Sequence, residues 1–182
     1  MTTSKNQSTP AKSAVPFGVL FGVIITFITI GIYYFEVNLF EDKSVGLVIN
    51  LLNYLILPIL LIFLATKNYK EKLNHGFLTL VDGLKIGVVI MLIAAIISGV
   101  FNAIYMQFFP ELIDDMFRLM EENMIKENPN MSQEQLEQVL SVSKKFMSPW
   151  ITIPVSMAIF SFIGLIYGLI FGTIFKKEQP HF

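Results

Sequence analysis

The sequence predicts an all-α, polytopic membrane protein with four transmembrane helices and an extracytoplasmic helical hairpin between helices three and four. Of its 182 residues, 54% are hydrophobic and only 15% are charged, against about 25% charged in a typical soluble domain. The mean hydropathy is +0.64. The chain also contains four uncharged runs of at least 19 residues, and about 20 helical residues cross the hydrocarbon core of a bilayer.

The uncharged runs and their polar flanks divide the chain into seven segments. The first run exceeds the roughly 7–15 apolar residues of a signal peptide and has no small-residue cleavage site after it, so we expect it to stay as a helix. In chain order, the predicted segments are a cytoplasmic tail (1–16), spans at 17–35, 44–66 and 86–109, an outer loop (110–147), a span at 148–175, and a cytoplasmic tail (176–182).

The orientation follows from the basic residues of the short flanks, which favour the cytoplasmic side. Eight lysines fall on the side of the two tails, whereas the other side has five basic residues. The longer loop on that side also carries eight acidic residues. We therefore expect an inner-membrane protein with both termini cytoplasmic. Four aromatic residues suited to the interface lie at the opposite, outer level: Tyr33, Tyr34, Tyr105 and Trp150.

The outer loop reads as two short helices. Pro110 suits a first helical position, and acids crowd the turn after it. Asn128-Pro129-Asn130 breaks the helix, and Ser132 with Gln135 forms a capping box that begins the second. Two interpretations are open: a solvated hairpin resting on the membrane surface, or an element that binds a partner.

One polar residue from each span lies at a common depth. At about 1.5 Å per residue, these residues fall roughly 9–12 Å below the outer interface; they are Thr29, Asn53, Asn102 and Ser156. We expect an interior polar layer, with Asn53 and Asn102 facing each other, because an amide facing lipid would lack hydrogen bonds. The layer either holds the helices together by hydrogen bonds or forms a vestibule for a small polar solute.

Glycines four residues apart mark faces without side chains, where another backbone can approach closely. The fourth span has three in register, Gly164, Gly168 and Gly172, and Gly18 with Gly22 mark the first span. Gly83 and Gly87 give a weaker signal at the start of the third. We expect the glycine face of the fourth span to pack on the first span, with dimerisation as the alternative.

The composition and motifs exclude several chemistries. The net charge of −1 excludes a nucleic-acid binder that works through a strongly basic face, and the absence of Cys excludes disulfides and thiolate metal sites. No ionisable residue lies in the centre of a span, where carriers and membrane enzymes place them. We expect Asp82 to pair with Lys85 at the interface and the two histidines, His75 and His181, to be solvated. No enzyme activity, cofactor, metal site or catalytic residue is expected.

The run KNYKEKLNHGFLTLVDGLKIG and the later run NMSQEQLEQV resemble an uncharacterised bacterial membrane family, domain of unknown function 4199. Asn74, Gly76, Phe77, Gly83 and Lys85 fall near that family's N-G-x-x-x-F-x-x-G-x-x-x-G pattern, with His75 inserted after the Asn. The resemblance covers nearly the whole chain. It implies a small integral membrane protein and brings no activity with it.

Two classes of function are open. The first is a structural or accessory protein that associates in the bilayer with a membrane protein or with copies of itself. The second is a small oligomeric carrier or channel for a polar solute. The absence of buried charge from the spans favours the first.

The orientation can be tested by labelling single cysteines, because the chain contains no native Cys. We expect Ser132→Cys to react with an impermeant maleimide in intact cells and Asn74→Cys to react only after lysis. The reverse pattern would invert the orientation, and equal labelling at both sites would contradict four spans.

Overall fold

The computed structural model describes residues 9–35, 37, 39 and 43–178, so Lys5 and His181 lie outside the described residues. Within that part of the chain the regular elements are all helical, and an isolated bridge joins Leu78 to Lys177. The elements are α1 (Pro10–Tyr34), α2 (Lys43–Leu51), η1 (Leu52–Ile56), α3 (Leu57–Asn68), η2 (Tyr69–Leu73), α4 (Leu80–Phe108), α5 (Glu111–Glu127), α6 (Gln133–Phe146) and α7 (Pro149–Ile174).

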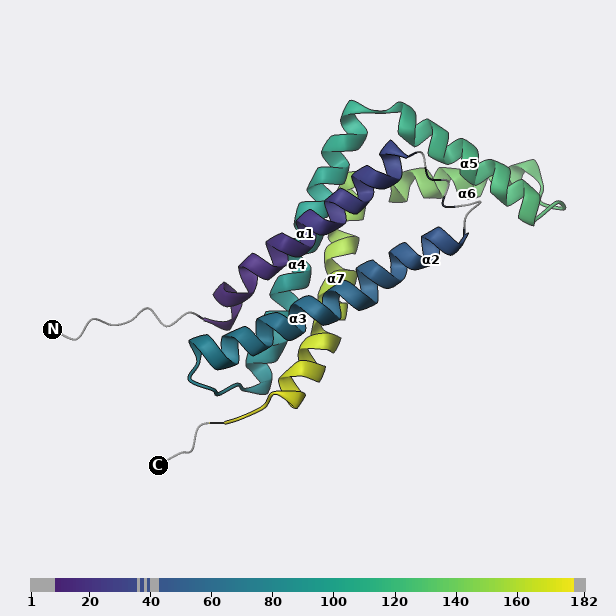
Figure 1. The fold of residues 1–182 in the computed structure, drawn as a ribbon. Coiled ribbons are helices and arrows are strands. Elements are labelled where there is room, and N and C mark those ends of the chain that lie inside the picture. The colour runs from purple at the N-terminus through teal and green to yellow at the C-terminus, as the bar shows by residue number, and fades with distance from the viewer. Residues whose placement is uncertain (1–8, 36, 38, 40–42, 179–182) are drawn as a thin grey trace.

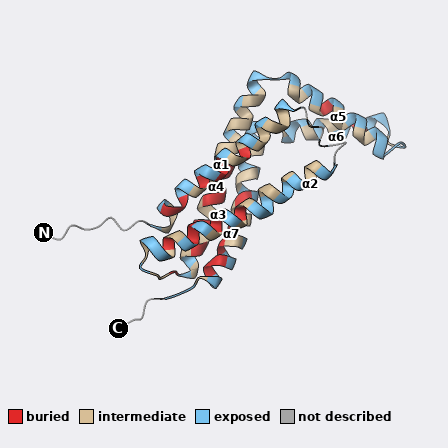
Figure 2. Ribbon diagram, in the orientation of Figure 1, coloured by how far each residue is buried: buried red, intermediate tan, exposed pale blue. Residues whose placement is uncertain are grey.

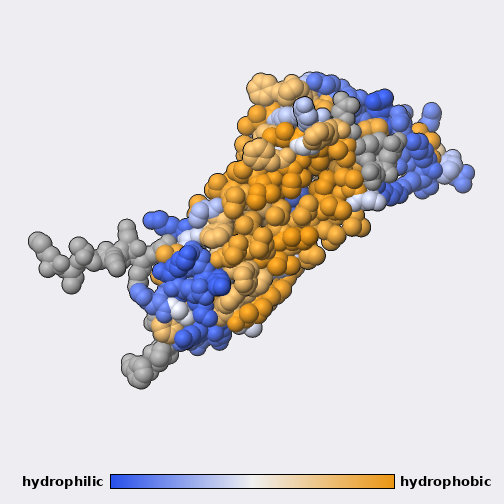
Figure 3. All heavy atoms as spheres, viewed as in Figure 1, coloured by the Kyte–Doolittle hydropathy of each residue, from blue (hydrophilic) through white to orange (hydrophobic). Residues whose placement is uncertain are grey.

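Four of these helical stretches are long and apolar enough to cross a membrane: Pro10–Tyr34, Lys43–Leu73, Leu80–Phe108 and Pro149–Ile174. The described chain begins and ends at the same end of the bundle (Figure 1). We call this the inner end, and the end that carries α5 and α6 the outer end. In the space-filling view an apolar belt separates polar surfaces at the two ends (Figure 3).

Helix boundaries differ from the sequence expectation where capping residues extend a helix into polar sequence. The first helix begins at Pro10 rather than at residue 17, because the Thr9 hydroxyl accepts the backbone N–H of Lys12 and Pro10 suits the first turn. The third span begins at Leu80. Its capping box pairs Thr79 with Asp82, and the Asp82 carboxylate accepts the Thr79 N–H at 3.0 Å. The expected ion pair between Asp82 and Lys85 is therefore wrong.

The second span is a continuous helical stretch with two π-helical segments, η1 and η2, at either end of α3. A π-helix carries one extra residue per turn and occurs most often as a short bulge within an α-helix. Pro58 is the second residue of α3, two positions after the end of η1. The sequence indicated the span but not these insertions.

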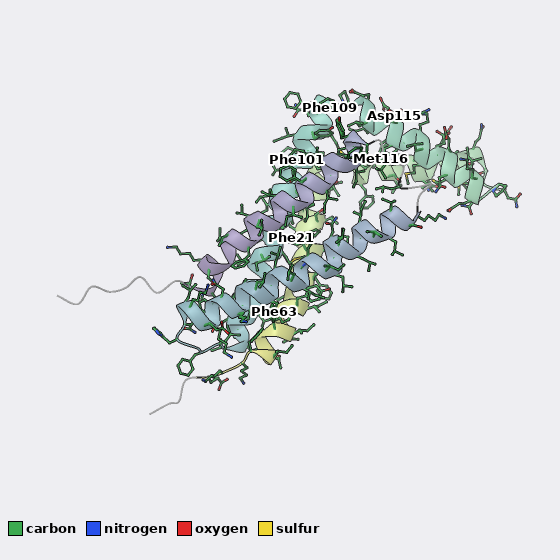
Figure 4. All side chains as sticks on the ribbon, in the orientation of Figure 1. Phe21, Phe63, Phe101, Phe109, Asp115 and Met116 are labelled. Carbon is green, nitrogen blue, oxygen red and sulfur yellow. The ribbon has the colours of Figure 1, made fainter. Side chains whose placement is uncertain are left out.

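The helix α4 is the centre of the bundle, since α1 and α7 pack on it far more extensively than any other pair of spans packs together. Completely buried residues include Phe21 of α1, Ile62 of α3, and Ile86 and Ile90 of α4. Phe21, labelled in Figure 4, approaches Phe160 of α7 with 6.4 Å between ring centroids. Rings from α1, α3 and α7 thus close the core around α4.

Buried residues gather in the inner half of every span (Figure 2). On α1 they end at Ile25 and on α4 at Ala95, while on α7 they begin at Phe160. No residue of α2 or η1 is buried. Figure 1 shows α2 leading away from the other spans towards α5 and α6. The bundle is therefore tightly packed at its inner end and open at its outer end.

The helices α5 and α6 lie between α4 and α7, within the segment 110–147. The break falls at Asn128–Asn130, and the capping box of Ser132 and Gln135 is present. Each helix buries one residue, Phe117 on α5 and Leu136 on α6. The Lys43 Nζ lies 2.6 Å from the Glu127 Oε1, which ties the start of α2 to the end of α5.

Candidate functional site

The glycine faces of α4 and α7 meet backbone to backbone near the inner end. A methyl group built on Gly168 would lie 2.7 Å from the Gly83 carbonyl oxygen, and one built on Gly164 would lie 2.6 Å from that of Gly87. A methyl group built on Gly172 would lie 3.0 Å from the Leu80 carbonyl oxygen. Real Cβ atoms do not come within 3.0 Å of such neighbours. Only glycine therefore allows the two helices to lie this close.

The glycines of α1 meet the other side of α4. A Cβ on Gly18 would lie 2.9 Å from the Ile93 Cβ, and one on Gly22 would lie 2.8 Å from the Ile97 Cβ. Side chains of α4 thus fill the space beside Gly18 and Gly22 on α1. In the α4–α7 contact, by contrast, glycines lie on both helices. The expectation that the fourth span packs on the first is wrong, because α4 lies between them and its Gly83 and Gly87 form the closest contact. The glycine face of α7 therefore packs within the chain, on α4.

The expected polar layer does not assemble. The Tyr33 hydroxyl of α1 donates to the Asn102 Oδ1 of α4 at 3.1 Å, and the Tyr33 ring stacks on Tyr105 with centroids 4.9 Å apart. The Thr29 hydroxyl donates to the Ile25 carbonyl of its own helix at 3.0 Å. Ser156 is half-buried on α7. Thr29 therefore bonds within its own helix and Asn102 bonds to α1, so these residues do not form one layer.

Asn53 and Asn102 do not face each other, which corrects the pairing expected from their depth. Asn102 bonds to α1, and the Asn53 Oδ1 is buried with no hydrogen-bond partner among the described residues. The physical reason is the position of the second span, which packs on α4 only weakly and through α3 rather than through η1. Depth along a helix does not specify the direction in which its side chain points.

A contact at η1 escaped the sequence reasoning. The Tyr167 hydroxyl of α7 donates to the Tyr54 carbonyl oxygen at 3.0 Å. In a regular helix this oxygen would accept the N–H of residue 58, but Pro58 has none. The Tyr54 ring also packs edge-on against Phe160. The signal was available, since Pro58 four residues after Tyr54 leaves one carbonyl to be satisfied by another helix.

The residues that carry the family resemblance form the turn at the inner end. The Asn74 side-chain amide donates to the Phe77 carbonyl at 2.9 Å, while His75 and Gly76 adopt positive φ angles of 53° and 85°. Leu78 and Lys177 exchange two backbone hydrogen bonds of 2.9 Å, which join the turn to the chain after α7. His75 is exposed. Among the described residues no group of three His, Asp or Glu could hold a metal ion.

A family model described as "Protein of unknown function (DUF4199)" matches residues 16–177, in agreement with the resemblance noted in the sequence. No curated protein and no solved structure matches the chain.

The glycine contact predicts a strong position dependence of stability. We expect Gly87→Ala to lower the free energy of unfolding by about 1–3 kcal/mol, the usual range for overpacking a tight contact. Gly31→Ala is the matched control, because nothing lies within 4 Å of a Cβ built there. It should change stability by no more than about 0.5 kcal/mol. Equal effects, measured by unfolding in mixed micelles, would contradict the close approach of α4 and α7.

The polar contacts predict which residues are energetically coupled. In a double-mutant cycle, Tyr33→Phe and Asn102→Leu should show a coupling of about 0.6–1.7 kcal/mol, as for other hydrogen bonds between membrane helices. Asn53→Leu should be neutral or stabilising because it removes an unpaired buried acceptor. Its effect should add to that of Asn102→Leu. Coupling between Asn53 and Asn102 would show that the two amides meet.

Proposed function

The chain belongs to this family of proteins of unknown function, and we propose that it is an integral inner-membrane protein that acts as an accessory subunit. Its four spans would hold it in the bilayer with both termini cytoplasmic. The open outer half of the bundle and the α5–α6 hairpin would bind another membrane protein. The proposal gives the chain no catalytic role.

The distribution of apolar residues supports the membrane location. In the apolar windows of the four spans, between 17% and 33% of the residues are buried inside the protein. Most of the residues in these windows are therefore at least partly exposed, and Figure 3 shows an apolar belt bounded by polar ends. Contiguous apolar surface of this extent is not tolerated in water, whereas helices satisfy their own backbone groups in lipid.

The observation that carries the accessory role is the open outer half. Buried residues end at Ile25 on α1 and at Ala95 on α4, and α2 has none. Helices in a bilayer associate through close packing rather than through the hydrophobic effect. The inner half of this bundle is packed in that way, and the outer half has helix faces that a partner helix could cover.

One stripe of α2 and η1 offers such a face. Gly46, Leu47, Asn50, Leu51 and Tyr54 recur at helical spacing along a shallow, open surface that also includes Leu39 and Lys43. Leu47 is 60% exposed. Since the Lys43–Glu127 ion pair holds the hairpin next to the start of this stripe, a partner that follows the stripe would also meet the hairpin.

A second candidate, a small oligomeric carrier or channel for a polar solute, draws support from η1. The unpaired Asn53 Oδ1 lies in this π-helical segment, and π-bulges in membrane helices and elsewhere are frequent at functional sites. The backbone contact of α4 with α7 argues against a path through the inner half of one chain. A pathway would have to run between copies.

Photo-crosslinking distinguishes these functions. A benzophenone side chain at Leu47 probes the α2 stripe, and one at Leu169 of α7 is the control, since Leu169 is 48% exposed in the packed inner half. We expect a protein adduct of defined mass from position 47 in native membranes and only lipid adducts from position 169. An adduct twice the mass of the chain would identify a homo-oligomer and favour the carrier.

Lipid adducts alone at both positions would contradict the accessory role. Membrane integration is tested separately by alkaline carbonate extraction, after which the protein should stay in the pellet. Release into the supernatant would refute integration itself.

A further inference from the structure

We infer that the inner end of the bundle carries a binding site for the phosphate headgroups of anionic phospholipids, formed around Lys70 and Lys177. The inference rests on the membrane location proposed above. It concerns the end of the molecule opposite the hairpin, so it is independent of any partner of the outer half.

The inner end has an excess of positive charge. Among the described residues, Asp82 is engaged in the capping box of α4, and Glu178 pairs with Lys176 at 2.9 Å. With Glu71, three carboxylates lie at this end of the described chain. Against them stand seven lysines: Lys12, Lys67, Lys70, Lys72, Lys85, Lys176 and Lys177. The space-filling view shows a polar surface at this end, directly bordering the apolar belt (Figure 3).

Two of these lysines are positioned by aromatic rings. The Lys70 Nζ lies 5.7 Å from the centroid of the Phe175 ring, and the Lys177 Nζ lies 5.6 Å from that of Phe77. Both distances fall within the range of cation–π attraction. The two ammonium groups therefore lie over aromatic rings at the inner end, with Lys70 half-buried and Lys177 exposed.

Backbone hydrogen bonds hold the two pairs in one cluster. The Gly76 N–H donates to the Lys70 carbonyl at 2.7 Å, which fixes the end of the second span next to the turn. The reciprocal bonds between Leu78 and Lys177 fix the chain after α7 against the same turn. Residues distant in sequence, from η2, the 74–79 turn and the segment after α7, thus supply one cationic surface.

This arrangement suits a ligand that is anionic at one end and apolar at the other. Lysines near a membrane surface attract anionic headgroups, and here the adjoining rings and apolar belt would contact the glycerol and acyl groups. A free phosphate would satisfy the charges but not the apolar surface. A zwitterionic lipid would satisfy the apolar surface but not the net charge.

The test compares phosphatidylglycerol with phosphatidylcholine of the same acyl chains, added to the full-length protein purified in a neutral detergent. Native mass spectrometry measures the dissociation constant of each lipid, and thermal unfolding gives an independent reading. We expect phosphatidylglycerol to bind at least tenfold more tightly at low ionic strength. This preference should fall steeply at 0.5 M salt, where charges are screened within a few ångströms.

The variants locate the site. Replacing one lysine should weaken phosphatidylglycerol binding about fivefold, so Lys70→Gln/Lys177→Gln should lose about 25-fold, while Lys70→Arg/Lys177→Arg should retain the preference. Lys144→Gln is the matched control, because the Lys144 Nζ also lies over a ring, 5.1 Å from the centroid of Phe117, but on the hairpin. It should leave the preference unchanged. The Arg variant guards against a loss caused by misfolding.

Equal binding of the two lipids, or an unchanged preference in the double Gln variant, would overturn the inference. If soluble glycerol phosphate displaced the lipid, the ligand of this site would be a free phosphate and not a phospholipid. If the protein were not membrane-integrated, neither lipid would stabilise it and carbonate would extract it. If the protein preferred the anionic lipid but gave no partner adduct at position 47, the lipid site would be supported and the accessory role would be contradicted.

Discussion

The approach of two helix backbones at a row of glycines is the contact on which the rest of this structure depends. In lipid, apolar side chains gain nothing by leaving their surroundings, so helices associate where their atoms can pack closely. Gly83 and Gly87 on α4 against Gly164, Gly168 and Gly172 on α7 provide that closeness over more than two turns. While α7 packs on one side of α4, the other side of α4 places Ile90, Ile93 and Ile97 against Gly18 and Gly22 of α1.

The position of the glycines also explains why the bundle opens towards one end. The glycines that contact a neighbouring span most closely all lie in the inner halves of α1, α4 and α7. In the outer half, a Cβ built on Gly99 would lie 3.3 Å from the Ile153 Cγ1, a less close approach than at the inner glycines, and nothing lies within 4 Å of one built on Gly31. Helix axes that are close at one end and cross at an angle separate at the other. The second span lacks such contacts, so among the described residues its outer part, α2, has no extensive contact with another span.

The sequence was sufficient for the class of the fold and for local signals, because these depend on nearby residues. Uncharged runs indicated four spans, and Ser132 with Gln135 marked a helix start that the structure contains. It was insufficient for contacts between helices. Spacing showed that Gly164, Gly168 and Gly172 share a face, but not that α4 covers it. Depth placed Asn53 beside Asn102, yet their directions around the helix axes differ. The bond from Tyr167 to the Tyr54 carbonyl required seeing both Pro58 and a distant phenol.

The central contact has a consequence for how the protein is made. Synthesis proceeds from the N-terminus, so α1, α2, α3 and α4 are complete before α7 exists. Until α7 packs on α4, no helix covers Gly83 and Gly87, and the Tyr54 carbonyl lacks the Tyr167 hydroxyl. A chain that stops before Pro149 would keep both defects. The inner core therefore stays incomplete until the 26-residue helix α7 packs on α4.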